Sequence, residues 1–258
     1  MSRHLPESRW NGVALLLALG LLWEIAGRQG WVHRLFFPPI SRILASLWAL
    51  TASGEVLRHV GVSLWRAALG YALAALVGIG LGVMMGYWRR AHEAGEVVIE
   101  LARALPPPAI IPVAIVLLGI EDAMKVFVIF FSCAFPILVN TTDGVRGVDP
   151  VLLRTARTFG VGEAATIAKV ILPAAAPFVM TGLRIALAIA LILTVISEMV
   201  GATAGIGYFI LDSQRSFRIP QMYAGMVVLA LLGYALNRAF LAADRRVLAW
   251  HRRASDAA

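Results

Sequence analysis

Few side chains in this sequence could do chemistry in a buried site. Histidine is the usual general base and metal ligand, but all five histidines lie outside the long apolar runs: His4, His33, His59, His92 and His251. A buried zinc site or histidine base is therefore not predicted. The apolar runs contain no pair of aspartates, and the chain has no Gly-x-Ser-x-Gly motif. We predict no catalytic residue, no metal ligand and no cofactor, so the chain is not expected to be an enzyme.

ATP hydrolysis by this chain is excluded by its lysines. A phosphate-binding loop needs Gly-Lys-Ser or Gly-Lys-Thr, because the lysine must reach the β and γ phosphates. The only two lysines, Lys125 and Lys169, follow a methionine and an alanine. If the protein performs active transport, either another chain hydrolyses ATP or an ion gradient drives it.

One carboxylate, Glu198, lies deep in an apolar run, and Glu24 is a weaker second candidate. Ionisable groups at such positions are often functional. Glu198 is therefore a candidate for a pathway or gate. The alternative is a helix contact in which Glu198 is hydrogen-bonded to Ser197 or to backbone. A single carboxylate is little support for a proton relay.

Composition places these residues in a membrane protein. The chain has 258 residues, of which 60% are hydrophobic and 15% are charged, and its mean hydropathy is +0.80. That many apolar side chains could not be hidden in one soluble core of this size. The net charge of +8 does not indicate nucleic acid binding, because the basic residues lie between the apolar runs and not on one aromatic-rich surface. The single cysteine, Cys133, is predicted to serve packing.

We predict an all-α integral membrane protein with about six transmembrane helices. Pro106, Pro107, Pro108 and Pro112 should prevent regular helix at the start of the third span. The remaining chain is too short for a separate soluble domain, so residues 1–258 are predicted to form one permease domain. Its core is 60–245, and 1–59 hold the first span and an interfacial segment at 37–60. The six apolar runs are 12–26, 67–88, 104–120, 126–142, 173–200 and 219–243.

Charge distribution predicts the orientation. With the N-terminus inside, segments 1–11, 88–104, 142–172 and 244–258 are cytoplasmic and hold 13 lysines and arginines. The segments on the other side, 27–60, 120–125 and 201–218, hold 7. Positive residues favour the cytoplasmic side, so both termini are predicted to be cytoplasmic.

Small residues recur every four positions in the second apolar run, at Gly70, Ala74, Gly78, Gly82 and Gly86. This spacing forms a smooth ridge that allows another helix to approach closely. The ridge is either a sliding or dimer interface or, as we favour, a static packing surface.

The inside loop at 149–160 contains a clearly delimited helix. Asp149 can cap it and Pro150 fits its first turn, while Gly160 can adopt the left-handed conformation that ends it. Leu152, Ala156 and Phe159 are expected on one face. A short helix of this kind at the cytoplasmic surface could dock to a partner protein.

Here the sequence resembles the importer-type ABC permeases. The spacing of Ala156, Gly160, Val170, Leu172 and Pro173 is similar to their cytoplasmic signature, in which Glu-Ala-Ala precedes glycine by four residues and hydrophobic-x-Leu-Pro ends the loop. In this register the triplet is Arg154-Thr155-Ala156, so arginine replaces the usual acidic residue. The literal Glu-Ala-Ala at 163–165 follows the glycine and is not the signature.

Further segments resemble the nitrate, sulfonate and taurine branch of these permeases over roughly 35–245. They are Phe37-Pro38-Pro39, Ser63-Leu64-Trp65-Arg66, Leu105-Pro106-Pro107-Pro108, Ser197-Glu198 and Gly205-Ile206-Gly207-Tyr208. The resemblance implies a type I ABC importer permease in the bacterial cytoplasmic (inner) membrane. It also implies a coupling helix between spans four and five.

The partners implied by this resemblance are a second copy of the chain, two cytoplasmic ATP-binding subunits and a periplasmic substrate-binding protein, with lipid around the spans. The expected substrate is a small anion such as a sulfonate, taurine or nitrate. The alternative is an ion-coupled secondary transporter or channel with no ATPase partner. The residues expected to form the ATPase-coupling loop are Leu152, Arg154, Thr155, Ala156, Phe159, Gly160, Leu172 and Pro173.

Overall fold

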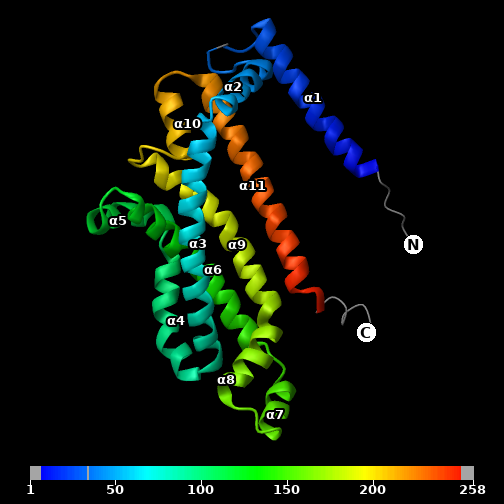
Figure 1. Cartoon of the computed structure of the whole chain (residues 1–258), viewed down its shortest axis with the longest axis vertical. Coiled ribbons are helices and arrows are strands. Elements are labelled where there is room, and N and C mark those ends of the chain that lie inside the picture. The colour runs from blue at the N-terminus through cyan, green and yellow to red at the C-terminus, as the bar shows by residue number, and fades with distance from the viewer. Residues whose placement is uncertain (1–6, 34, 251–258) are drawn as a thin grey trace.

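The computed structural model describes residues 7–33 and 35–250, and this part of the chain is helical and contains no β-strand (Figure 1). Between the longer helices lie one 3₁₀ turn, η1, and one π-helical segment, η2. The elements are α1 (Glu7–Gln29), α2 (Ile40–Ala52), α3 (Glu55–Tyr87), α4 (Arg89–Ala104), η1 (Pro107–Ile110), α5 (Ile111–Leu118), α6 (Asp122–Arg146), α7 (Pro150–Thr158), α8 (Glu163–Thr166), η2 (Ile167–Ile171), α9 (Leu172–Met199), α10 (Ile206–Arg215) and α11 (Ile219–Val247).

Four helical segments in the described residues are long and apolar enough to cross a membrane: Glu55–Tyr87, Asp122–Arg146, Glu163–Met199 and Ile219–Val247. To within one residue they cover the predicted second, fourth, fifth and sixth runs. The predicted first run lies within α1, a 23-residue helix with several exposed leucines, including Leu17 and Leu21.

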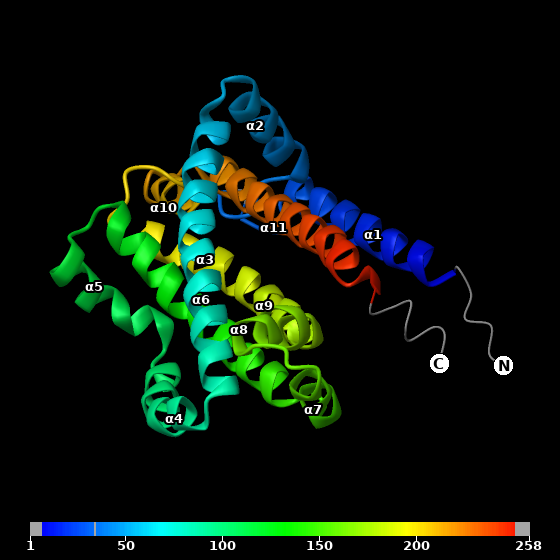
Figure 2. The same cartoon turned by 60° about the horizontal axis from the view of Figure 1, so that its bottom comes forward.

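The irregular start predicted for the third run, 104–120, is confirmed, but the run does not form a separate span that starts at residue 104. Residues 89–104, predicted to be a loop, form α4 instead, and this helix runs beside α3 (Figures 1 and 2). The chain then breaks before Pro107 and bends by 94° into η1 and α5. Prolines explain the break, because each one lacks a backbone N–H and disfavours helix in the residue before it. The pair α4 and α5 is thus one bent element. Counted as a single span, it would raise the number of spans in the described residues from four to five.

Helices α3, α6 and α9 pack side by side as the centre of the bundle (Figures 1 and 2). The glycine ridge of α3 lies against α6, as the packing interpretation predicted. A Cβ added to Gly82 would lie 2.6 Å from the Thr141 Cβ, and one added to Gly78 would lie 3.0 Å from the Ala134 carbonyl oxygen. The α9 residue Gly182 meets Pro136 and Asn140 of α6 in the same manner. Small residues therefore bring these three backbones together.

A second apolar cluster joins α2, α10 and α11 at the end of the bundle far from α7 (Figure 1). Ile43 and Leu50 of α2 are buried in this cluster, which also contains Phe209 of α10, while Trp48 is 77% exposed. The predicted interfacial segment 37–60 therefore contains a real helix, although residues 55–60 already belong to α3. The predicted outside loop 201–218 contains α10, a helix that the sequence reading missed.

Candidate functional site

Helix α7 begins and ends at the predicted residues. The Asp149 carboxylate accepts a hydrogen bond from the Val151 backbone N–H at 2.7 Å, and Pro150 occupies the first turn. Gly160 follows the helix with a φ of +67°, the left-handed conformation that glycine adopts without strain. Local sequence signals alone are therefore enough to define this nine-residue helix.

The faces of α7 differ from the predicted arrangement. Ala156 is only 7% exposed and is directed toward its own chain, whereas Leu152 and Phe159 are 47% and 81% exposed. Leu153 packs against the small core cluster that contains Ile171, and this packing fixes the rotation of the helix. The apolar surface left for a partner therefore consists of Val151, Leu152 and Phe159, and Ala156 is not part of it.

The rest of the loop is held to the bundle. The Trp88 indole N–H donates to the Glu163 carboxylate at 3.2 Å, which links the α3–α4 corner to the start of α8. Segment η2 then leads directly into α9, where Leu172 is half-buried and Pro173 is exposed. Arg154 and Thr155 are exposed on α7. The predicted loop residues thus form one protrusion that is continuous with α9, at the far end of the molecule (Figure 1).

The opposite end of α9 carries a buried polar cluster, here called the Glu198 cluster and consisting of Ser63, Arg66, Asp122 and Glu198. The Glu198 side chain has no exposed surface, and its carboxylate accepts three kinds of hydrogen bond. Ser63 Oγ lies 2.9 Å from both oxygens and shares its one hydrogen between them, and Arg66 Nη1 and the Gly207 N–H each donate at 2.9 Å. The carboxylate is therefore fully occupied within the bundle.

Arg66 connects this carboxylate to the rest of the bundle. Its Nε donates to Asp122 Oδ1 at 2.8 Å, and its Nη1 also donates to the Ala204 carbonyl oxygen at 2.7 Å. The Arg66 side chain is 6% exposed, while that of Asp122 is 57% exposed. One guanidinium therefore joins α3, the first residue of α6, the end of α9 and the turn before α10.

The turn before α10 is shaped around this cluster. Gly205 has a φ of +119°, and a Cβ added there would collide with the Glu198 carboxylate. Its N–H donates to His59 Nδ1 at 3.0 Å, and the Ile206 N–H donates to Ser63 Oγ at 2.8 Å. Backbone amides thus satisfy polar atoms that burial would otherwise leave unpaired.

The predicted alternatives for Glu198 can be compared with this geometry. Glu198 is hydrogen-bonded between helices, but its partners are Ser63, Arg66 and Gly207 and not Ser197. Its role at a pathway or gate stays a prediction, and in this conformation the side chain faces no open space. Arg66 was missed as its partner. The available signal was weak: Arg66 lies directly before the second apolar run, and an arginine and a glutamate at the apolar runs of two helices favour pairing.

Metal binding has no support in residues 7–33 and 35–250. No three His, Cys, Asp or Glu side chains in that part of the chain lie close enough to share an ion.

The sequence of this chain is similar to those of known transport proteins. The family described as "Binding-protein-dependent transport system inner membrane component" matches residues 78–249. The putative aliphatic sulfonates transport permease protein SsuC of Bacillus subtilis is 31% identical over 240 residues, covering 93% of this chain and 87% of the relative. The taurine transport system permease protein TauC of Escherichia coli is 31% identical over 244 residues, covering 92% of this chain and 88% of the relative.

Among solved structures, inward-facing conformations of the MetNI methionine ABC transporter superpose with a TM-score of 0.63 at 20% identity. The match covers 74% of this chain and 95% of the solved chain. At this identity the likeness establishes the fold.

Proposed function

We propose that this chain, which belongs to the family of binding-protein-dependent transport system inner membrane components, works as a dimer with two ATP-binding subunits and a periplasmic binding protein. Two predictions from the sequence are confirmed: the type I permease fold and the function as a permease component of an ABC importer. The single permease domain, the residues of the coupling loop and the separate ATPase are parts of the proposal. The chain itself is not assigned any catalysis.

The observation that carries the proposal is the exposed apolar surface of α7. Phe159 is 81% exposed and Leu152 is 47% exposed at the tip of a capped helix that protrudes from the bundle. An ATP-binding subunit with an apolar groove would cover these side chains. Arg154 and Arg157, both exposed, lie beside this surface and favour an acidic rim on the groove. Arg154 replaces the acidic residue of the family signature, so the partner groove should be more acidic where it faces Arg154.

The connection from α7 to the Glu198 cluster supports the transfer of motion. Helix α9 has 28 residues and runs from the loop to Glu198, a length of about 42 Å at roughly 1.5 Å per residue. Its first turns are joined to α7 through η2 and the buried Ile171. A displacement of α7 would therefore be transmitted along α9, as one rigid element, to the Glu198 cluster at its opposite end.

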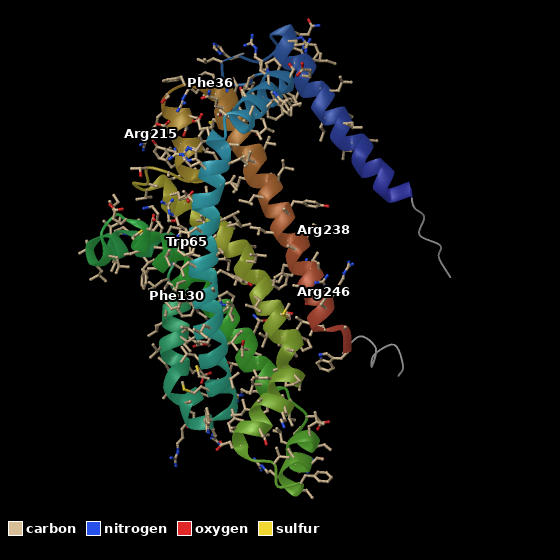
Figure 3. The ribbon with its side chains drawn as sticks, in the orientation of Figure 1. Phe36, Trp65, Phe130, Arg215, Arg238 and Arg246 are labelled. Atoms are coloured by element: carbon tan, nitrogen blue, oxygen red, sulfur yellow. The ribbon has the colours of Figure 1, made fainter. Side chains whose placement is uncertain are left out.

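The proposed orientation places α7 and both termini in the cytoplasm. Arg246 lies at the lower end of α11 in Figure 3, toward the α7 end of the bundle, while Arg215 lies on α10 at the opposite end. The segments predicted to be cytoplasmic, 1–11, 88–104, 142–172 and 244–258, hold 13 lysines and arginines and the segments on the other side hold 7, which favours the α7 end as the cytoplasmic one.

The proposed substrate is a small anion. Relatives that match most of this chain have names that refer to aliphatic sulfonates and to taurine, and a nitrate import permease protein of Synechocystis matches 70% of it at 33% identity. All of these solutes carry an oxyanion, which is the property that we transfer to this chain.

Replacement of an exposed apolar side chain of α7 by a charged one tests the proposal. In Phe159→Glu the apolar anchor is lost, and affinity for the ATP-binding subunits should fall by about 2 kcal/mol or more. The measurement is co-purification of those subunits with the permease, followed by ATPase activity with loaded binding protein. Phe217→Glu is the matched control, because Phe217 is 67% exposed and lies at the other end of the molecule.

Retention of the ATP-binding subunits by Phe159→Glu would contradict the docking role. A wild-type permease that never co-purifies with an ATPase, yet transports with an ion gradient alone, would instead be a secondary transporter or channel.

A further inference from the structure

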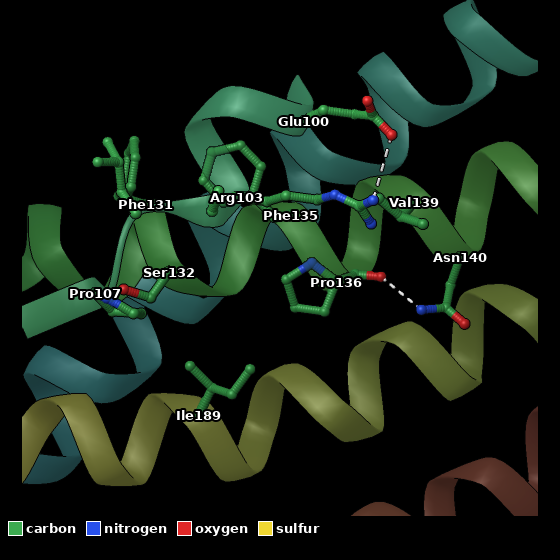
Figure 4. A pocket seen from close by; sticks show the side chains of 12 residues that line it. Glu100, Arg103, Pro107, Phe131, Ser132, Phe135, Pro136, Val139, Asn140 and Ile189 are labelled. Carbon is green, nitrogen blue, oxygen red and sulfur yellow. Dashed lines mark hydrogen bonds and ion pairs between the residues drawn. The ribbon is translucent and has the colours of Figure 1, made fainter. Parts of the chain in front are cut away.

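A cavity of about 700 Å³ lies between the end of α4, the middle of α6 and α9 (Figure 4). It is separate from both the α7 surface and the Glu198 cluster. On α6 it is lined by residues between 131 and 140, which lie halfway along that helix. Ile189 of α9 faces these residues from the other side (Figure 4). The cavity is therefore at mid-depth in the bundle.

One wall of this cavity contains a cation. Arg103 is in the last turn of α4, and its side chain is 50% exposed. In the described part of the chain its one ion-pair partner is Glu100, with 3.4 Å between Arg103 Nη2 and Glu100 Oε1. A guanidinium has five N–H donors, and one long contact leaves most of them available. An arginine at this depth marks a site for a solute or ion.

The polar atoms nearby come from α6 around Pro136, which lies inside this continuous helix. Pro136 has no N–H to donate to the Ser132 carbonyl one turn earlier, so that acceptor lacks its usual helical donor. The Asn140 amide nitrogen donates to the Pro136 carbonyl oxygen at 2.8 Å, which places the amide group on the cavity wall. The 3₁₀ turn that begins at Pro107, directly after the break that follows α4, completes the same wall. Irregular backbone at membrane depth is tolerated where it lines a water-filled cavity.

The remaining wall is aromatic. The rings of Phe131 and Phe135 meet edge to face with centroids 4.9 Å apart, and both residues line the cavity. Such a surface offers nothing to a small inorganic anion, but it can cover a hydrocarbon chain. A cation beside an aromatic wall therefore matches a ligand with one oxyanion and one apolar part.

We propose that this cavity binds a small organic anion inside the membrane, with its oxyanion on Arg103 and Asn140 and its hydrocarbon part on Phe131 and Phe135. The inference rests on the proposed function in that the ligand is the transported solute. Glu100 offsets part of the positive charge of Arg103, which keeps the site weak enough for the solute to leave. The site thus selects organic sulfonates or carboxylates over nitrate.

The test is direct binding of radiolabelled butane-1-sulfonate to the permease with its ATP-binding subunits in nanodiscs, without the binding protein. Wild type should bind saturably. Arg103→Gln should weaken binding about tenfold or more, because a charge-assisted hydrogen bond is lost, and Arg103→Lys should weaken it less. Arg89→Gln is the matched control, because Arg89 also lies on α4 and pairs with Glu93, but it lies outside the cavity.

The aromatic wall is tested by competition. The double variant Phe131→Ala, Phe135→Ala should lose affinity for butane-1-sulfonate severalfold and leave the much weaker competition by nitrate unchanged. Thermal unfolding of each variant shows whether it is folded. If Arg103→Gln does not fold, Arg103→Lys still tests the site, because it keeps the positive charge and removes the guanidinium.

Each outcome separates this site from the proposed function. No saturable binding to wild type, equal binding by Arg103→Gln, or nitrate that competes as well as butane-1-sulfonate overturns the cavity site. ATP-driven uptake in proteoliposomes with the binding protein tests the proposed function independently. Uptake that persists unchanged in Arg103→Gln leaves the importer in place and overturns only the cavity site.

Discussion

The two ends of α9 illustrate different ways of building a functional region. At one end α7 is a short, exposed helix whose cap, first turn and terminating glycine are adjacent in sequence. At the other end the Glu198 cluster is buried, and Glu198 binds Arg66 from 132 positions away and Ser63 from 135 positions away. The first region exposes most of its residues, Ala156 apart, and is ready to contact another protein. The second buries Ser63, Arg66 and Glu198, exposes only Asp122, and holds four segments of the chain together.

This contrast has an energetic consequence. Exposed ion pairs contribute little to stability, because water screens both charges in either state. A buried pair has a large desolvation cost that only the intact partner offsets, so loss of one partner is severe. We therefore expect changes in the Glu198 cluster to affect folding and changes in α7 to affect coupling.

The largest expected effect is in the Glu198 cluster. Arg66→Leu leaves the Glu198 carboxylate buried without its cation, which should lower the free energy of unfolding by about 3–5 kcal/mol. The double variant Arg66→Leu, Glu198→Leu should lose less than the sum of the single changes, because no buried charge is then left unpaired and Asp122, which also loses Arg66, is 57% exposed. Unfolding of the detergent-solubilised permease, thermally or with denaturant, measures both.

Arg89→Leu is the control for this comparison. Arg89 is 92% exposed in its ion pair with Glu93, so its loss should change stability by less than about 1 kcal/mol. Equal destabilisation by Arg66→Leu and Arg89→Leu would show that the Glu198 cluster is not different from a surface pair.

How far the sequence predicted each region follows from the range of the interactions. Asp149, Pro150 and Gly160 act on their own helix, so their spacing predicted α7 correctly. The partners of Glu198 depend on the packing of α3 against α9, which no local pattern specifies. The same limit applied to Ala156, whose burial depends on the rotation of α7 against Ile171. Proline positions predicted the break near Pro107 but not the 94° bend that it allows.

The ridge between the two ends provides the next largest effect. At Gly82 an added Cβ would lie 2.6 Å from the Thr141 Cβ and 2.8 Å from the Leu138 carbonyl oxygen. Gly82→Leu should therefore destabilise the permease by about 1–3 kcal/mol through overpacking. Gly80 is two residues away on the same helix and has nothing within 4 Å of an added Cβ, so Gly80→Ala should be neutral or slightly stabilising. The same unfolding measurement checks both, and a stable Gly82→Leu would mean that α3 and α6 separate without cost.

The smallest expected effect is at the cap of α7, and it separates folding from coupling. Asp149→Ala removes the hydrogen bond from the Val151 N–H and should destabilise α7 by about 1 kcal/mol. Because α7 touches the bundle mainly through Leu153 and Ala156, the free energy of global unfolding should be almost unchanged. Amide hydrogen exchange should become faster within α7 alone. Docking requires the folded helix, so the affinity for the ATP-binding subunits should fall in proportion to the loss of folded α7, at most about fivefold.

Asp149→Asn keeps a side-chain oxygen that caps equally well, and it should behave as wild type in both measurements. If Asp149→Asn were impaired as much as Asp149→Ala, the carboxylate charge would be the relevant property, and α7 would bind its partner through Asp149 directly.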